Sequence, residues 1–382
     1  MIYLDHAATT PLSPAAERAW LAAQRRLRDT PGNPSALHAG GRVAARIVED
    51  ARVQIAGALG ADRAEVLFTS GATESNALGV IGGARGAATP DQKTVLISSV
   101  EHDSVGNLGE AAPDLDWRLM PVSRDGVTVI EPVGPEVALA SLALVCAETG
   151  IIQPVSDLVE AAGKTLVHTD AAQAVGHMPI NFHDLGVDLM TIGGHKIGAP
   201  VGTGALFVRR GVKITTDRPG GGQERKYRSG TVDAAGAAAL AAAVVETTEN
   251  LQREVTHQMV LREHLMAGLP EEVRLTSPAK TSPGIVHLSL PTSHPEVLLL
   301  SMDQAGIMVS AGSACHSGVT RPSQILLSMG RSEQEALGVL RVSFGRENTV
   351  EDVDFFLRAL PAALEAAGRM DERDARKGKQ AQ

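Results

Sequence analysis

The chain has 382 residues, of which 43% are hydrophobic and 21% are charged, a balance typical of a globular protein. Its formal net charge is −9 and its basic residues are dispersed, so the composition favours no nucleic-acid partner. We also expect no membrane partner, because no apolar run is long enough for a transmembrane helix. The N-terminus lacks a secretory signal, and the only two cysteines are Cys146 and Cys315. We therefore expect a cytoplasmic protein with free thiols.

A chain of this length usually exceeds one hydrophobic core, so we expect a large and a small domain. We predict a large domain over residues 16–249, and a smaller one formed by residues 250–368 together with residues 1–15. The polar segment 369–382 mixes charges of both signs and is expected to be a flexible tail.

Seven short runs are predicted to be strands, and most of them are apolar on both faces, as buried parallel strands are. They are residues 65–69, 94–98, 117–122, 138–145, 165–169, 188–192 and 204–208. Helical patterns lie among them at residues 40–59, 73–86, 104–112 and 154–162. This alternation predicts an α/β sheet with helices on both faces.

The pattern changes after the three glycines 220–222. An Ala-rich helix is predicted over residues 234–266, because alanine is the best helix former. Further on, we expect helices at 295–305 and 350–364 and strands at 284–290, 307–310 and 339–344. This looser alternation predicts a separate, smaller α+β unit.

One candidate site is the segment 69–76 (TSGATESN), which closes a strand and opens a helix. The free N–H groups and the positive end of the helix dipole suit a phosphate there. Ala72 lets an anion approach the backbone, and Thr73 adds a hydroxyl donor. The alternative is an ordinary strand–turn–helix with a threonine cap.

A second candidate is Asp170, at the carboxyl end of an apolar strand in the segment HTDAAQ (168–173). Ligands of α/β folds bind at such ends, and a carboxylate there can pair with the protonated ring nitrogen of a pyridine cofactor. Gln173 can reach a phenolic oxygen of the same ring. The alternative for Asp170 is a helix N-cap.

A third candidate is Lys196, which lies between glycines after a buried strand, in IGGHKIGAP (192–200). Burial lowers the pKa of a lysine, so the amine can form a Schiff base and act as a base, and His195 can donate to a phosphate. His102 follows another strand, where it can stack on a flat ring and move protons. A surface turn with an exposed lysine and a satisfied loop histidine are the alternatives.

The last candidate is Cys315, in the segment SAGSACHSG (310–318). Small residues on both sides make an accessible loop, where a cysteine is poorly placed for packing but well placed to attack as a thiolate. An incidental exposed cysteine is the alternative.

Together these segments resemble the cysteine desulfurases of the NifS/IscS kind, within the class V aminotransferase family. The resemblance runs from YLDHAATTP (3–11) to about Leu364, and its specificity lies in the order and spacing of the motifs. It includes GNPS (32–35), residues 70–76, 170–173 and 194–196, GGGQERKYRSGT (220–231), residues 310–315 and RVSFGR (341–346). It implies the fold of type I pyridoxal-phosphate enzymes, with a mostly parallel seven-stranded sheet in the large domain.

The resemblance also implies roles for individual residues. Lys196 would carry pyridoxal 5′-phosphate, and Cys315 would take sulfur from L-cysteine as a persulfide, leaving L-alanine. The cofactor would be held by Ala72, Thr73, His102, Asp170, Gln173, His195, Lys196 and Thr231. Thr231 would reach the phosphate of a partner subunit, which implies a homodimer, while Asn33 and Arg341 would bind the substrate carboxylate. No metal is implied.

The persulfide would pass to an acceptor protein of unidentified nature, for iron–sulfur cluster assembly or another sulfur-transfer pathway. Two alternatives remain open: a binding or assembly protein without efficient turnover, and a lyase acting on selenocysteine or another cysteine derivative.

The sequence departs from the family pattern at two cofactor positions. Ala147 stands where the family usually has an asparagine that bonds the phenolic oxygen, and Gly193 stands where it often has a serine that touches the phosphate. One lost hydrogen bond to a charged group is worth about 1.5–3 kcal/mol, so we expect weaker cofactor binding or a shifted spectrum. Cys146, beside Ala147, is expected to be a small core residue.

Overall fold

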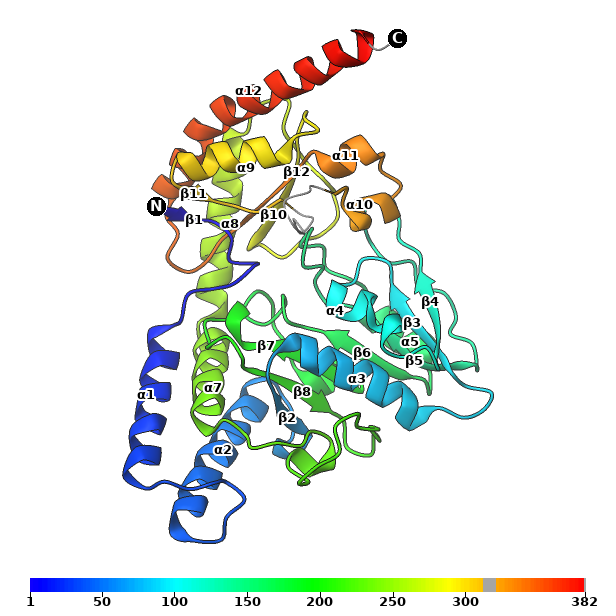
Figure 1. Cartoon of the computed structure of the whole chain (residues 1–382), viewed down its shortest axis with the longest axis vertical. Helices are drawn as coiled ribbons and strands as arrows, with labels where there is room; N and C mark the ends of the chain where they lie inside the picture. The colour runs from blue at the N-terminus through cyan, green and yellow to red at the C-terminus, as the bar shows by residue number, and fades with distance from the viewer. Residues whose placement is uncertain (312–320, 381–382) are drawn as a thin grey trace.

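The computed structural model describes residues 1–311 and 321–380, and its larger part is built on a seven-stranded sheet (Figure 1). The strand order is β2-β8-β7-β6-β5-β3-β4, and β8 alone runs antiparallel to its neighbours. The predicted mostly parallel sheet is therefore confirmed. The strands are β2 Val66–Thr69, β3 Thr94–Ser98, β4 Asp116–Met120, β5 Val137–Ser141, β6 Leu166–Asp170, β7 Leu189–Gly193 and β8 Gly204–Val208.

Helices cover this sheet, and the most central of them is α3, Ala72–Ala87, which lies against β5, β6, β7 and β8 (Figure 1). Its glycines allow this close contact: a side chain at Gly83 would meet Leu189 and Leu139 at 2.8 and 3.0 Å. The other helices of this part are α1 Pro14–Asp29, α2 Ala39–Ala58, α4 Asp103–Gly106, α5 Val155–Ala162, α6 Phe182–Leu185 and α7 Ala234–Glu249, with short 3-10 turns at η1 Arg63–Glu65, η2 Leu108–Glu110, η3 Gly194–Lys196 and η4 Glu224–Lys226.

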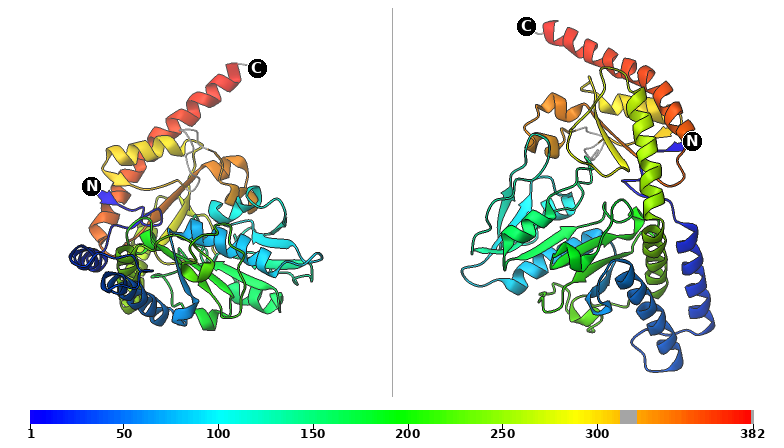
Figure 2. Two further views of the ribbon diagram at one scale, coloured as in Figure 1. Left: turned by 60° about the horizontal axis from the view of Figure 1, so that its bottom comes forward. Right: turned by 180° about the vertical axis from the view of Figure 1, so that it is seen from behind.

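The Ala-rich stretch forms two helices rather than the single one expected over residues 234–266. Helix α7 ends where Thr248 and Asn250 turn their side chains onto carbonyls of the preceding turn, and α8, Leu251–Gly268, starts at once. Such local bonds compete with helix propagation. The two helices still lie nearly end to end and link the two parts of the molecule (Figure 2).

The smaller part contains a three-stranded antiparallel sheet of order β12-β10-β9 and a two-stranded parallel pair formed by β1 and β11. The N-terminal strand thus pairs with a segment 300 residues away in the chain. The elements are β1 Ile2–Tyr3, β9 Arg274–Leu275, β10 Ile285–Ser289, α9 Pro295–Gln304, β11 Ile307–Met308, α10 Gln324–Ser328, α11 Glu333–Leu337, β12 Val339–Ser343 and α12 Val350–Gln380.

Separate hydrophobic cores lie in the two parts. Two clusters pack around the seven-stranded sheet, and a third combines Leu4 with residues between Leu261 and Ala367. These cores support the division at residue 250 and the placing of residues 1–15 in the small domain, which we keep as a proposal. Among the described residues, no helix is both long and apolar enough to cross a membrane.

The C-terminal segment differs from the expected flexible tail, because helix α12 continues to Gln380. Three contacts account for this. An i,i+4 ion pair joins Arg369 to Glu365, and Asp371 accepts a hydrogen bond of 3.0 Å from the Ser293 N–H ahead of α9. His294 also contacts Asp374, with 3.1 Å between Nε2 and a carboxylate oxygen. Mixed charges here extend a helix rather than fray it.

Candidate active site

The carboxyl ends of several parallel strands place most of the predicted site residues at one edge of the sheet. Strands β2, β3, β6 and β7 run in the same direction. Asp170 ends β6, Lys196 closes the 3-10 turn after β7, His102 follows β3, and Ala72 starts α3 after β2. This is the edge at which α/β sheets bind ligands.

Gly193, at the end of β7, lies where three of these segments meet. A Cβ atom built on it would lie 3.3 Å from the Ala72 Cβ, 3.6 Å from the Ala172 Cβ and 3.8 Å from the Lys196 Cγ. The start of α3, the residues after Asp170 and the stem of Lys196 are therefore neighbours in space. Gly71, just ahead, has a φ of +146° and nothing within 4 Å of its Cβ position, so the backbone at the start of α3 is open.

The Lys196 amine is largely buried, and it donates hydrogen bonds of 2.6 and 2.8 Å to the carbonyls of Ala7 and Ala8. Burial is the main cause that lowers the pKa of Lys196 to about 8. The positive charge of Arg341 acts in the same direction, and Asp170 and Asp5 act in the opposite one. An amine with such a pKa can be neutral near physiological pH and act as a nucleophile or a base.

A chain of hydrogen bonds joins Asp170 to His102. The Asn76 side-chain amide donates to Asp170 Oδ2 at 2.7 Å and to Ser104 Oγ at 2.8 Å. Because Ser104 Oγ accepts from Asn76, its own hydroxyl proton can go to His102 Nδ1, 2.9 Å away. His102 Nδ1 also accepts from the Ser104 N–H, which leaves the proton of the neutral ring on Nε2. The other Asp170 oxygen accepts from the Ala172 N–H.

Glu101, next to His102, is a buried carboxyl group that sequence reasoning did not single out. One of its oxygens accepts from the Ala143 N–H at 2.8 Å, and the other, Oε2, is buried without a hydrogen-bond partner. Burial raises the pKa of Glu101 to about 8, and the negative charge of Asp170 adds to the effect. Glu101 is therefore a protonated carboxyl group at neutral pH, next to the site.

The N-terminal segment 5–10 lies across the site and contacts several predicted residues. Gln173 donates from Nε2 to the Ala7 carbonyl at 2.8 Å, the same carbonyl that Lys196 reaches. His195 Nδ1 lies 3.2 Å from Thr9 Oγ1. Burial is the main cause that lowers the pKa of His195 to about 4, and Lys196 and His102 contribute in the same direction. This ring is therefore neutral at physiological pH.

Arg341, in β12, reaches the same region from the smaller part. Its Nη2 donates to Asp5 Oδ1 at 3.0 Å, and its Nη1 donates to the Ala147 carbonyl at 2.8 Å. Its position is fixed by backbone pairing with His287 and Ser310 on either side. The Arg341 side chain is 10% exposed, so its charge faces the site in a largely desolvated setting.

Asn33 and Thr231 lie together, and among the described residues neither side chain hydrogen-bonds to the residues above. Asn33 Nδ2 donates to Thr231 Oγ1 at 3.4 Å, and both residues are exposed. Asn33 therefore makes no contact with Arg341, the other predicted carboxylate ligand, within the described residues of this chain. A cavity of about 90 Å³ lies beside Thr231 and extends to Ser70 and Arg228.

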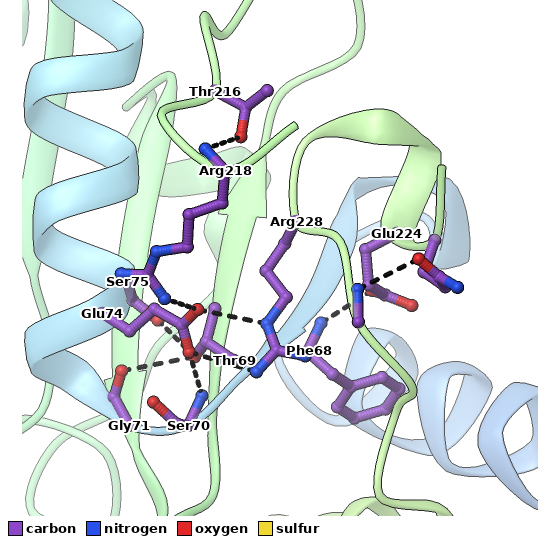
Figure 3. Close-up of polar contacts among 12 residues, drawn as sticks. Phe68, Thr69, Ser70, Gly71, Glu74, Ser75, Thr216, Arg218, Glu224 and Arg228 are labelled. Atoms are coloured by element: carbon purple, nitrogen blue, oxygen red, sulfur yellow. Dashed lines mark hydrogen bonds and ion pairs between the residues drawn. The ribbon is translucent and has the colours of Figure 1, made fainter. Parts of the chain in front are cut away.

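Glu74, in the first turn of α3, ties the segment ahead of Thr231 to the start of this helix (Figure 3). Arg218 and Arg228 both donate to Glu74 Oε1, at 2.7 and 3.1 Å, and the Ser70 N–H donates to Oε2 at 2.6 Å. Figure 3 shows both arginines converging on this one carboxylate. These contacts hold the glycine-rich segment against the expected phosphate site.

The same segment contains three consecutive non-glycine residues in the left-handed region, Glu224, Arg225 and Lys226, with φ of 42°, 57° and 69°. Each costs about 1–2 kcal/mol relative to the right-handed conformation. A buried pair compensates: Arg52 donates to both Glu224 oxygens at 2.9 and 2.7 Å, and the Phe68 N–H donates to Glu224 Oε2 at 2.8 Å.

Of the two cysteines, Cys146 is among the described residues. Cys315 lies outside the described residues, so its predicted role has no structural account. Cys146 is a free, fully buried thiol whose pKa is raised by burial, and its N–H bonds the Ile151 carbonyl in a tight turn. A buried thiol with a raised pKa is a packing residue rather than a nucleophile.

Comparison with known proteins identifies the family. The profile of the aminotransferase class-V family matches residues 2–356. The chain belongs to this family. It is 39% identical over 390 residues to the IscS-like cysteine desulfurase of Mycobacterium tuberculosis, covering 97% of this chain and 98% of that one.

Solved structures agree in fold. A NifS-like protein superposes with a TM-score of 0.87 at 30% identity, covering 95% of this chain and 99% of that chain. SspA, solved in complex with cysteine, superposes with a TM-score of 0.77 at 27% identity, covering 90% of this chain and 99% of that one. The predicted fold and the family of cysteine desulfurases are thus confirmed, and the cofactor of this family is pyridoxal 5′-phosphate.

The residues present fit this cofactor. An amine with a lowered pKa and an open helix N-terminus lie around Gly193, with a carboxylate at the same sheet edge, and these groups suit the aldehyde, the phosphate and the ring nitrogen of such a cofactor. Sequence reasoning missed Asn76, Ser104, Glu101 and Asp5. Asn76 lies within the segment 69–76 and Asp5 within residues 3–11, but only the fold shows which residues they contact.

Proposed function

We propose that the protein converts L-cysteine to L-alanine and takes the sulfur onto Cys315 as a persulfide. The observation that carries this proposal is the meeting of Lys196, Ala72 and the segment after Asp170 around Gly193, in a chain of the cysteine desulfurase family. Pyridoxal phosphate, when bound to Lys196, supplies an electron sink for the substrate carbon, which Asp170 strengthens by pairing with the ring nitrogen.

The chain's own residues divide the remaining work. Arg341 binds the substrate carboxylate, and Lys196, whose pKa is lowered to about 8, takes the proton from the substrate Cα when its amine is neutral. His102, held through Nδ1 by Ser104, presents its Nε2–H toward the ring face. Ala72, Thr73 and His195 hold the phosphate, and Gln173 bonds the phenolic oxygen.

Sulfur transfer is assigned to Cys315. Its thiolate attacks the substrate sulfur, so an S–S bond forms while the substrate Cβ–S bond breaks and its electron pair stays on carbon. Protonation of that carbon, together with return of a proton to the substrate Cα, gives alanine. The persulfide then passes to a thiol of an acceptor protein.

We further propose that the enzyme is a homodimer in the cytoplasm. The support for a dimer is that Thr231, an expected phosphate ligand, is exposed and bonds to Asn33, which leaves its side chain accessible to a second subunit. A partner subunit would bring an equivalent threonine to the site. The free thiol of Cys146 is in keeping with a reducing compartment.

The departures at Ala147 and Gly193 favour a second candidate, a family member that binds cofactor but turns over poorly and serves in sulfur-transfer assembly. A lyase for selenocysteine is a third candidate of the same chemical class. The rate of product formation from each amino acid distinguishes these three candidates. Purified holoenzyme is given L-cysteine or L-selenocysteine with a reductant, and alanine and sulfide or selenide are quantified.

We expect alanine and sulfide in equal amounts from cysteine, loss of the cofactor absorbance in Lys196→Ala, and loss of turnover with retained absorbance in Cys315→Ala. Cys146→Ala is the matched control, since Cys146 is the only other cysteine of the chain, and it should keep most of the activity. A wild-type protein that retains the cofactor yet forms no alanine from cysteine contradicts the proposal.

A further inference from the structure

The Arg341 guanidinium, the proposed ligand of the substrate carboxylate, already has a carboxylate beside it within the chain. Asp5 Oδ1 accepts from Arg341 Nη2 at 3.0 Å, and the two side chains are 20% and 10% exposed. Screening by water is weak at such depth, so the charge of Asp5 is felt strongly at Arg341 and at anything bound to it.

Asp5 is held firmly in this place. Its backbone forms a bridge to Ser343, two residues beyond Arg341 on β12, and its carbonyl accepts from the Ala8 N–H at 3.0 Å and from the Tyr3 hydroxyl at 3.0 Å. The carboxylate is thus a fixed feature of the site, built by pairing of the N-terminal segment with β12.

Arg341 does not depend on Asp5 for its orientation. Its backbone is paired on both sides in the strand region, and Nη1 donates to the Ala147 carbonyl at 2.8 Å. Two opposite effects of Asp5 on substrate binding can therefore be weighed. Orientation by Asp5 would strengthen binding, but the guanidinium is already fixed; repulsion between the Asp5 carboxylate and the substrate carboxylate weakens binding and has no substitute.

We propose that Asp5 is a counter-ion of Arg341 that weakens the site's affinity for the carboxylate of both substrate and product. This inference rests on the proposed role of Arg341. Because cysteine and alanine carry the same carboxylate, tight binding at Arg341 would hold both equally and slow product release without accelerating the chemical step. A neighbouring anion limits that uniform binding.

The test uses holoenzyme and two probes, L-alanine and L-alaninamide, which differ only in the carboxylate. In Asp5→Asn, and in Asp5→Ala if the asparagine variant has a lowered melting temperature, the dissociation constant of L-alanine measured by calorimetry should fall threefold or more. That of L-alaninamide should fall clearly less, because only L-alanine carries the carboxylate. The KM for cysteine should fall in parallel while kcat changes by less than threefold. Asp116→Asn, an exposed aspartate on β4, is the control of equal charge change.

The amide probe is needed because Asp5 also raises the pKa of Lys196, an effect that would change the binding of both probes alike. An unchanged or weakened affinity for L-alanine in the Asp5 variants overturns the inference. Arg341→Ala separates this failure from that of the proposed function: if L-alanine binds to that variant as to wild type, Arg341 is not the carboxylate ligand and the assignment of Arg341 fails first.

Discussion

Asn76 donates its side-chain amide to Asp170 Oδ2 at 2.7 Å, and with its second hydrogen it reaches Ser104 Oγ, which lies against His102. One buried amide thus connects the residue proposed for the ring nitrogen with the residue proposed for the ring face. Asn76 thus supplies one buried donor to Asp170 Oδ2, while the Ala172 N–H supplies one to Oδ1.

We predict that Asn76→Ala reduces the rate of alanine formation tenfold or more, since one hydrogen bond to a charged group is worth about 1.5–3 kcal/mol. Steady-state kinetics and the cofactor absorbance spectrum measure the effect. Ser104→Ala removes the side-chain contacts with His102 and Asn76 but keeps the bond from Asn76 to Asp170, so it should cost less. Equal losses in the two variants would show that the bond to Asp170 is not the important one.

Glu101 predicts a pH dependence of stability. Its pKa is raised from 4.5 to about 8 in the folded protein, so the folded state binds more protons than the unfolded state between these values. Stability from this group is fully present below pH 4.5 and is lost as the pH rises through about 8. Glu101→Gln removes the titration, so its melting temperature should fall less than that of wild type between pH 5 and pH 9.

The control for this measurement is Glu272→Gln, an exposed glutamate that should leave the wild-type slope unchanged. Glu148, whose pKa is raised to about 7 by burial, contributes in the same direction and remains in every variant. A Glu101→Gln slope equal to that of wild type would mean that Glu101 is ionised in the folded protein at neutral pH.

The sheet was predictable because its strands are short apolar runs; β3 and β8 have the predicted bounds. Two features of the helices were not predicted. Helix α1 begins with Ser13 capping the Ala16 N–H and proline at its first position, a signal present in the sequence but not used. The break between α7 and α8 depends on side chains of Thr248 and Asn250 that bond backward, which helix propensity does not include.

The site divides in the same way. Lys196 and Asp170 stand in motifs whose residue types carry chemistry, so their positions were predictable. Glu101, Asn76 and Asp5 owe their properties to their surroundings in the fold. Glu101 has a buried oxygen without a hydrogen-bond partner, Asn76 bonds Asp170 on another element, and Asp5 bonds Arg341, which is 336 residues away in the chain. Those relationships are made by the topology and have no local signal.

Gly193 gives a prediction on cofactor retention. A Cβ there would lie 3.3 Å from the Ala72 Cβ, a tight contact that needs a shift of a few tenths of an ångström. Gly193→Ser adds a hydroxyl beside the expected phosphate, and it should slow loss of the cofactor on dialysis about tenfold, as one added charge-assisted hydrogen bond would. Gly193→Ala adds the same contact without the hydroxyl and should not. Equal retention in both variants contradicts a phosphate at this position.

The Arg52–Glu224 pair predicts a large, coupled effect on stability. Their side chains are 8% and 3% exposed, and removing one partner leaves a buried charge unpaired, which costs about 3–5 kcal/mol. Arg52→Met and Glu224→Met should each lower the free energy of unfolding in urea by that amount. The double variant should be more stable than the sum of the two losses implies.

The exposed pair formed by Arg369 and Glu365 serves as the reference, and Arg369→Ala should cost less than about 1 kcal/mol.

Cofactor retention should also depend on the Arg52–Glu224 pair, because Glu224 begins the left-handed turn that precedes Arg228 and Thr231. We expect Glu224→Met to release cofactor faster at temperatures where the protein is still folded. If Arg52→Met and Glu224→Met are additive, the two residues act separately and the turn is held by its own backbone.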